Sequence, residues 1–219
     1  MDHAYMIDDF IDMKRYVYGK FTGGNDNNYE DVEFEGIVRK FDLQACLMFR
    51  IWAPAGLESC GPSRISINSR SKSPPDFGYG PWGEFQLVSE SFVDIVERLD
   101  PGVHQFIRIP ETYIKGGIRI NKTYYIMNVV RTVDALDVLN SNVRLEKRRD
   151  YSTSDIVYKS KYHINRPVKL SFYRNIVCNI NMWRGSSQDI NRLFFSKNLV
   201  SEILSRKLSS LPYIVVDLV

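Results

Sequence analysis

Hydrophobic and polar residues alternate along much of the chain, and this period of two predicts strands. The clearest case near the N-terminus is Val32 to Phe41, where apolar residues alternate with Glu33 and Glu35. Further segments alternate or are rich in β-branched and aromatic residues, which also favours strands. These segments are Ala45 to Trp52, Ser63 to Ser69, Val103 to Ile109, Ile118 to Val133, Ser152 to Lys159, Val168 to Tyr173 and Ile176 to Trp183.

Two segments follow the helical period of 3.6 instead, one beginning near Ser89 and the other near Ser196. A serine at this position accepts hydrogen bonds from the amides of the first turn, and Asp100-Pro101-Gly102 stops the first helix. We expect both apolar stripes to be buried. The stripes are Phe92, Ile95, Val96 and Leu99 in the first helix, and Leu199, Ile203, Leu204 and Leu208 in the second.

The two helical segments resemble each other at an offset of 107 residues, because Leu87–Val96 is echoed by Phe194–Ile203. Each is followed by a strand-like segment, Val103 to Ile109 in one case and Tyr213 to Leu218 in the other. A unit that occurs twice indicates two similar corners in one architecture. We therefore predict an α+β fold with mixed, largely antiparallel sheets and two similar serine-capped helix–strand units.

A long irregular segment precedes the first helix. Pro54 to Gly83 holds five of the nine prolines and five of the thirteen glycines, which disfavour regular elements. We expect residues 1–80 to form a β-rich, variable N-terminal region with this Pro/Gly loop, and residues 81–219 to form the core. One compact unit is the alternative.

Composition places the chain among ordinary globular proteins. It has 219 residues, of which 44% are hydrophobic and 25% charged, and no apolar run approaches the length of a membrane span. The acidic N-terminus does not resemble a secretory signal, so we expect a cytoplasmic protein without membrane contact. The three cysteines are far apart, which argues against a disulfide framework or a zinc site.

The sequence carries little that indicates catalysis. It lacks a nucleophile elbow, a Walker loop and a zinc-protease motif. Asp134 and Asp137 could pair for acid–base or metal chemistry, but we expect Asp134 to cap a turn and Asp137 to lie at the surface. We therefore expect neither enzyme activity, cofactor nor metal. An enzyme of unrecognised type remains an alternative.

Charge is distributed unevenly along the chain. Residues 1–42 hold ten acidic and five basic residues, a net charge of −5, and the remainder carries +8. Much of the basic excess lies between Arg144 and Arg174, where four tyrosines are interleaved. Basic residues with aromatics suit a nucleic-acid groove, so a nucleic-acid-binding module is a second alternative, although no recognition motif supports it.

Several segments together resemble a known family. They are Leu87–Phe92, Leu99–Phe106, Tyr125–Asp137 and Phe195–Leu199. In these residues the chain resembles a bacterial polymorphic-toxin immunity family typified by a myxobacterial protein and formerly known as a domain of unknown function. The likeness runs from about Trp82 to the C-terminus. It implies a cytoplasmic protein that binds and neutralises a cognate secreted toxin, of the polymorphic or type VI kind, by direct protein contact.

The resemblance implies no individual contact residues, so the toxin-binding surface has to be inferred from the less family-like part of the chain. Acidic residues there would steer a partner, and aromatic residues on a stiff loop would anchor it. The candidates are Asp8, Asp9, Asp12, Glu33, Glu35, Phe77, Tyr79 and Trp82. In the alternative interpretation the three aromatic side chains fold back and fill the core.

Overall fold

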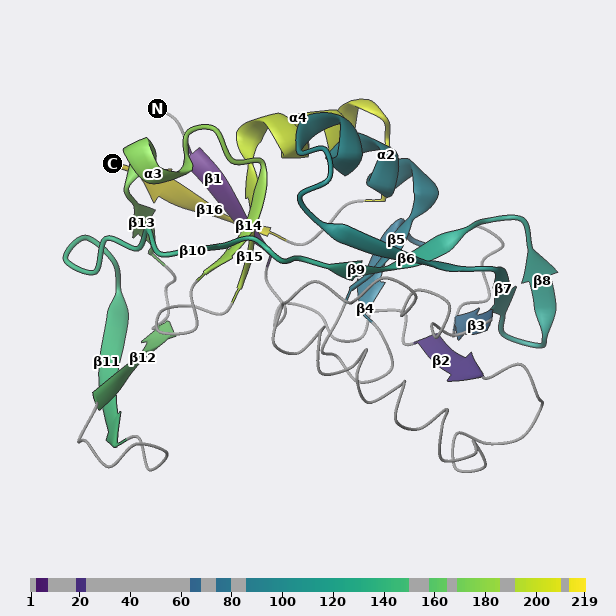
Figure 1. Ribbon diagram of the computed structural model, residues 1–219, viewed down its shortest axis with the longest axis horizontal. Coiled ribbons are helices and arrows are strands. Elements are labelled where there is room, and N and C mark those ends of the chain that lie inside the picture. The colour runs from purple at the N-terminus through teal and green to yellow at the C-terminus, as the bar shows by residue number, and fades with distance from the viewer. Residues whose placement is uncertain are drawn as a thin grey trace. The chain divides into compact units, whose positions relative to one another are not determined.

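The computed structural model describes residues 3–7, 19–22, 64–67, 74–79, 86–149, 158–164, 169–185, 192–209 and 213–219 (Figure 1). The chain forms two compact units, each drawn from separate stretches. Unit 1 comprises Met1–Ile11, Arg131–Glu202 and Pro212–Val219, and unit 2 comprises Asp12–Val130 and Ile203–Leu211. The division expected near residue 80 is therefore not where these units meet along the chain.

Unit 1 is built on a six-stranded sheet with the order β10-β14-β15-β1-β16-β13. The strands are β1 (His3–Ile7), β10 (Thr132–Val133), β13 (Ser171–Phe172), β14 (Met182–Gly185), β15 (Leu193–Ser196) and β16 (Tyr213–Leu218). Pairing is antiparallel from β14 to β16 and parallel at the two ends. One core cluster packs on this sheet and includes Met6, Phe172, Trp183, Phe194 and Val216.

Two further elements of unit 1 lie outside this sheet. The short helix α3 (Arg174–Val177) follows β13. The strands β11 (Val143–Arg149) and β12 (Tyr158–Ile164) form a separate antiparallel two-stranded sheet.

Unit 2 contains two four-stranded sheets, with the orders β2-β3-β7-β8 and β4-β5-β9-β6. The first is formed by β2 (Gly19–Thr22), β3 (Arg64–Ile67), β7 (Glu111–Ile114) and β8 (Ile118–Ile120), and the second by β4 (Phe77–Tyr79), β5 (Gln86–Ser89), β6 (Gln105–Ile109) and β9 (Tyr124–Asn128). Helix α2 (Glu90–Leu99) packs on the second sheet (Figure 1), where the rings of Phe92 and Phe77 lie 5.7 Å apart.

The predicted repeat is present in both units. In unit 2, β5 leads through α2 to β6, and in unit 1, β15 leads through α4 (Lys197–Ser205) to β16. In each unit a third strand lies between the two strands and pairs antiparallel with both: β9 in unit 2 and β1 in unit 1. The α+β fold is therefore confirmed, and both units share one topology.

The register shows that the two copies match residue by residue. Tyr124 of β9 lies opposite Ser89 and Ile109, and Ala4 of β1 lies opposite Ser196 and Val216. Both pairs of partners differ by the 107 residues seen in the sequence. Tyr124 and Ala4 consequently occupy equivalent positions.

The equivalence extends to the hairpins that precede the two helices. Phe77 of β4 lies opposite Val88, and Met182 of β14 lies opposite Phe195. The residue before each of these strands accepts a hydrogen bond from the serine at the start of the helix. Ser89 N donates to Asp76 O at 2.8 Å, and Ser196 N donates to Asn181 O at 2.8 Å. Asp76 and Asn181 are therefore equivalent too.

Both helices begin directly after the predicted serines, but only one serine side chain acts as a cap. Ser196 Oγ accepts a hydrogen bond from Leu199 N at 3.1 Å, whereas the hydroxyl of Ser89 makes no capping hydrogen bond to α2. Helix α2 ends at Leu99, as the following Asp-Pro-Gly sequence predicts.

The predicted apolar stripes are buried only in part. Phe92, Ile95 and Val96 of α2, and Leu199 and Ile203 of α4, are buried. Leu204 was expected to be buried and is 52% exposed, so that expectation is wrong. Helix α4 ends at Ser205, before Leu208, so this stripe is shorter than its spacing suggests.

The strand predicted over Ile176 to Trp183 is also wrong. The chain forms α3, then a turn closed by the hydrogen bond from Ile180 N to Val177 O at 3.1 Å, and only then β14 from Met182. Alternating asparagines imitate a strand here, although asparagine also favours turns. The strands predicted over Val32 to Phe41 and Ala45 to Trp52 lie outside the described residues.

Truncating the large side chain beneath α2 should destabilise the fold. We expect Phe92→Ala to lower the unfolding free energy by about 3–5 kcal/mol, because the buried ring leaves a cavity that the sheet cannot refill. Leu204→Ala, at an exposed helical position, is the matched control and should change it by less than about 0.5 kcal/mol. Urea unfolding of both variants measures this. A near-neutral Phe92→Ala would contradict the packing.

Candidate functional site

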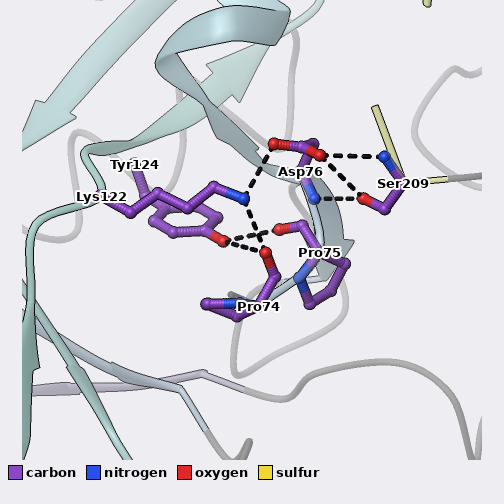
Figure 2. A network of polar contacts seen from close by, with 6 residues as sticks. All are labelled: Pro74, Pro75, Asp76, Lys122, Tyr124 and Ser209. Carbon is purple, nitrogen blue, oxygen red and sulfur yellow. Dashed lines mark hydrogen bonds and ion pairs between the residues drawn. The ribbon is translucent and has the colours of Figure 1, made fainter. Parts of the chain in front are cut away.

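The two equivalent helix starts are filled differently, and unit 2 is the filled one (Figure 2). The side chain of Tyr124 is 2% exposed, and its hydroxyl donates to the carbonyl oxygens of Pro75 at 2.6 Å and Pro74 at 3.1 Å. Burial, with a smaller contribution from the charge of Asp76, raises the pKa of the Tyr124 phenol. Tyr124 therefore remains a neutral donor that pins the Pro-Pro segment to β9.

Asp76 lies at the centre of the polar network beside Tyr124 (Figure 2). Lys122 Nζ lies 2.8 Å from Asp76 Oδ1 and donates to Pro74 O at 2.6 Å. On its other side, Asp76 Oδ2 accepts hydrogen bonds from the backbone N–H of Ser209 at 2.9 Å and from its hydroxyl at 3.2 Å. The same hydroxyl accepts a hydrogen bond from Asp76 N.

This network holds the carboxylate in its charged form. Burial would raise the pKa of Asp76, but the hydrogen bonds from Lys122 and Ser209, with the positive charge of Lys122, outweigh burial and lower it. Both carboxylate oxygens are engaged by these partners. The arrangement therefore fastens Pro74–Asp76 and the segment around Ser209 to the second sheet, and it serves as a structural clasp.

At the equivalent position of unit 1 the structure is open. A pocket of about 660 Å³ lies beside the first turn of α4, and its lining includes Ala4, Ile180 and Trp183. The corresponding residues of unit 2 are Tyr124, Pro75 and Gly78, and these line a space of only about 10 Å³. The small side chain of Ala4 leaves room where Tyr124 fills the other copy.

Aromatic and amide groups shape this pocket. Trp183 is 1% exposed and stacks on Phe194, with ring centroids 5.6 Å apart and planes 18° apart. Asn181 Oδ1 accepts hydrogen bonds from Ser196 Oγ at 3.0 Å and Asn198 Nδ2 at 3.3 Å. The pocket wall is therefore organised by the same serine that caps α4.

A rigid turn in unit 1 presents an exposed apolar side chain. Asp137 Oδ1 accepts hydrogen bonds from the backbone N–H of Leu139 at 3.0 Å and of Asn140 at 3.3 Å, and Asn140 Nδ2 donates to Oδ2 at 2.6 Å. The Asn140 side chain is the main cause of a lowered Asp137 pKa. Leu139, at the tip, is 93% exposed.

The turn corrects the expectation for the two aspartates. Asp137, expected at the surface, is only 4% exposed, and it is the residue that caps the turn. Its carboxylate is occupied by the turn's own N–H groups. Among the described residues there is no group of three or more His, Cys, Asp or Glu side chains that could hold a metal ion.

The β11–β12 sheet carries the basic stretch noted in the sequence. Its register places Arg148 opposite Lys159 and Arg144 opposite His163. Like charges that face each other across two strands destabilise the pair. A hairpin with such pairs would gain from an anionic partner.

Most of the expected toxin-binding residues lie outside the described residues: Asp8, Asp9, Asp12, Glu33, Glu35 and Trp82. Tyr79 is the last residue of β4. Phe77 is 5% exposed and packs against Phe92, so for this residue the core-filling interpretation holds and it offers no exposed anchor.

Comparison with known families follows from this geometry. The sequence pattern of the immunity protein family Imm11 matches residues 62–217, which include both helix–strand units. The chain belongs to the Imm11 immunity protein family. No protein with a curated description matches the chain.

The Imm11 match changes the expected extent of the family-like part. It begins at residue 62 rather than near Trp82, so the Pro-Pro clasp and β4 fall within the Imm11 region. Only the acidic candidates from Asp8 to Glu35 precede it. No helix among the described residues of this Imm11 chain is long and apolar enough to cross a lipid bilayer.

Sequence reasoning missed the clasp and the pocket. Lys122 and Ser209 are far from Asp76 in the sequence, and only pairing with β9 and the segment after α4 brings them together. The pocket had one usable signal, the small Ala4 in an otherwise bulky strand.

The clasp should make stability depend on pH in the acid range. We expect Asp76→Asn to lower the unfolding free energy at pH 7 by about 1.5–3 kcal/mol, the typical value of hydrogen bonds to a charged group. The lowered pKa means that the charged form stabilises the fold above the unfolded-state value of about 3.9. This contribution is lost as the pH falls through the folded pKa.

Urea unfolding of wild type and Asp76→Asn between pH 7 and pH 2 measures this difference. The gap between the two proteins should be constant above about pH 5 and should shrink below about pH 4. Asp94→Asn, at an exposed carboxylate of α2, is the matched control and should stay within about 0.5 kcal/mol of wild type at pH 7. A gap that is independent of pH would refute the ionic clasp.

Proposed function

We propose that this chain binds a cognate bacterial toxin, a secreted effector of the polymorphic or type VI kind, and neutralises it by direct protein–protein contact in the cytoplasm. Membership of the Imm11 immunity protein family carries this proposal. Contact inhibition requires a folded surface that matches one partner, and it needs no catalytic groups on the inhibitor.

The acidic N-terminal segment is our first candidate for toxin recognition. Asp8, Asp9, Asp12, Glu33 and Glu35 precede the residues shared with the family, and recognition of one particular toxin should fall on the part that the family pattern does not cover. Acidic side chains would steer a basic toxin by complementary charge. Tyr79 and Trp82 would then serve as the neighbouring aromatic anchors.

The direct test is a protection assay. The chain is co-expressed with the C-terminal toxin domain of the secreted protein encoded beside its gene, and affinity is measured by titration calorimetry. Protection with a 1:1 complex supports the proposal. Growth arrest despite abundant folded protein, with no heat of binding, refutes it.

Removing the aromatic anchors should weaken the complex. We expect Tyr79→Ala or Trp82→Ala to reduce toxin binding by at least ~2 kcal/mol, because buried aromatic side chains dominate interface energetics. Thermal melts should show that both variants remain folded. Phe77→Ala is the contrasting variant, since its ring is part of the core and its loss should lower the melting temperature instead. Wild-type affinity in both anchor variants would place the contact elsewhere.

Leu139 is a second candidate anchor, one that the described surface itself provides. The turn capped by Asp137 holds this leucine almost fully exposed, so little side-chain order is lost when a partner covers it. We expect Leu139→Ala to weaken toxin binding by about 1–2 kcal/mol. Leu204→Ala removes another exposed leucine and should leave affinity unchanged, and calorimetry on both variants decides. Equal affinities of Leu139→Ala and wild type would exclude the turn from the interface.

A further inference from the structure

We propose that the pocket of unit 1 is a binding site for an organic anion, a carboxylate carried on a flat apolar body. The first argument is the room that the repeat leaves. Ala4 occupies the position of Tyr124, and the space beside it measures about 660 Å³ against about 10 Å³ in unit 2. Pockets of 300–1,000 Å³ typically hold small molecules.

The second argument is a reversal of charge between the two copies. Asp76, Glu90 and Asp94 of unit 2 correspond to Asn181, Lys197 and Ser201 of unit 1. All three residues of unit 1 line the pocket, and none of its lining residues is acidic. Where the filled copy carries three carboxylates, the open copy carries one cation and two neutral polar groups.

The third argument is the set of donors around the pocket. It adjoins the first turn of α4, where the helix dipole favours an anion. The exposed ammonium of Lys197 has no ion pair or hydrogen bond to any described residue. The indole Nε1 of Trp183, a lining residue, is buried without a hydrogen-bond acceptor in the described part of the chain.

These features select the chemistry of the ligand. An anionic oxygen would complement Lys197 and the helix start, and it would offer the acceptor that the indole N–H lacks. The flat body would pack on the aromatic and apolar wall formed by Trp183, Ala4 and Val177. The carboxylate could belong to a free small molecule or to an acidic side chain of the toxin. The site itself does not depend on the proposed function.

Titration of the whole chain with sodium benzoate, followed by ¹H–¹⁵N spectra, tests the site. The three tryptophans give three indole N–H signals, and Trp183→Phe identifies the signal of Trp183. We expect benzoate to shift this signal saturably, with a dissociation constant of about 1 mM or lower, as a ligand of this size allows. Benzamide, the neutral isostere, should bind at least ~10-fold more weakly.

Charge variants separate anion binding from unspecific contact. Lys197→Met and Ser201→Glu change exposed positions of α4, so the fold should persist, and each should weaken benzoate binding about fivefold or more. Lys169→Met alters an exposed lysine of unit 1 that does not line the pocket, and it should bind like wild type. Ala4→Tyr copies the filled unit and should abolish the shift. If Ala4→Tyr fails to fold, the two α4 variants alone decide.

Three results would overturn the proposal: no saturable shift of the Trp183 signal, equal binding of benzamide, or equal loss in Lys169→Met and Lys197→Met. Once benzoate binding is established, Ser201→Glu in the protection assay identifies the source of the carboxylate. Lost protection assigns it to the toxin, and full protection assigns it to a free small acid. Either result is consistent with the site.

Discussion

The architecture depends on one pairing constraint, in which an antiparallel strand lies between the two parallel strands of a strand–helix–strand unit. In unit 2, β9 hydrogen-bonds to β5 and β6, and in unit 1, β1 does the same between β15 and β16. Without the middle strand, the facing edges of both partners would be left without hydrogen-bond partners, which is costly in a buried sheet. The helix then covers a sheet that the middle strand has completed.

The two copies obtain this strand from different parts of the chain. β9 follows its own helix–strand unit, whereas β1 comes from the N-terminus, nearly 190 residues before β15. Unit 1 is consequently assembled from three separate stretches. Ala4 and Met6 of β1 belong to its core cluster, so the N-terminal strand is part of the immunity protein's folded structure even though it lies outside the family match.

One scaffold therefore offers two different surfaces at the same place. Unit 2 uses a tyrosine, a lysine and an aspartate to close the start of α2 and to fix the Pro-Pro segment. Unit 1 keeps the hydrogen bond between strand and helix start but replaces the tyrosine by alanine and the acids by neutral or basic residues. Duplication separates a closed, stabilising copy from an open copy in which a ligand can be accommodated.

The sequence by itself determined the elements whose signal is local. The stripes around Phe92 and Leu199, the serines before them and the Asp-Pro-Gly stop were enough to place both helices and the repeat, because helix caps and periodicity act within a few residues. Membership of an immunity family also followed from such local patterns. Local signals failed where two structures share one pattern, as in the alternating asparagines before β14, and where exposure depends on neighbours, as at Leu204.

Only the tertiary structure decided which strand lies between the repeated ones and what fills the space beside it. Asp76 meets Lys122 and Ser209, and Ala4 meets Trp183, through strand pairing over long sequence separations, which no local period encodes. Whether an aromatic residue such as Phe77 faces the core or a partner is likewise set by the register of β4 against β5. A shift of one residue would place it on the opposite face of the sheet.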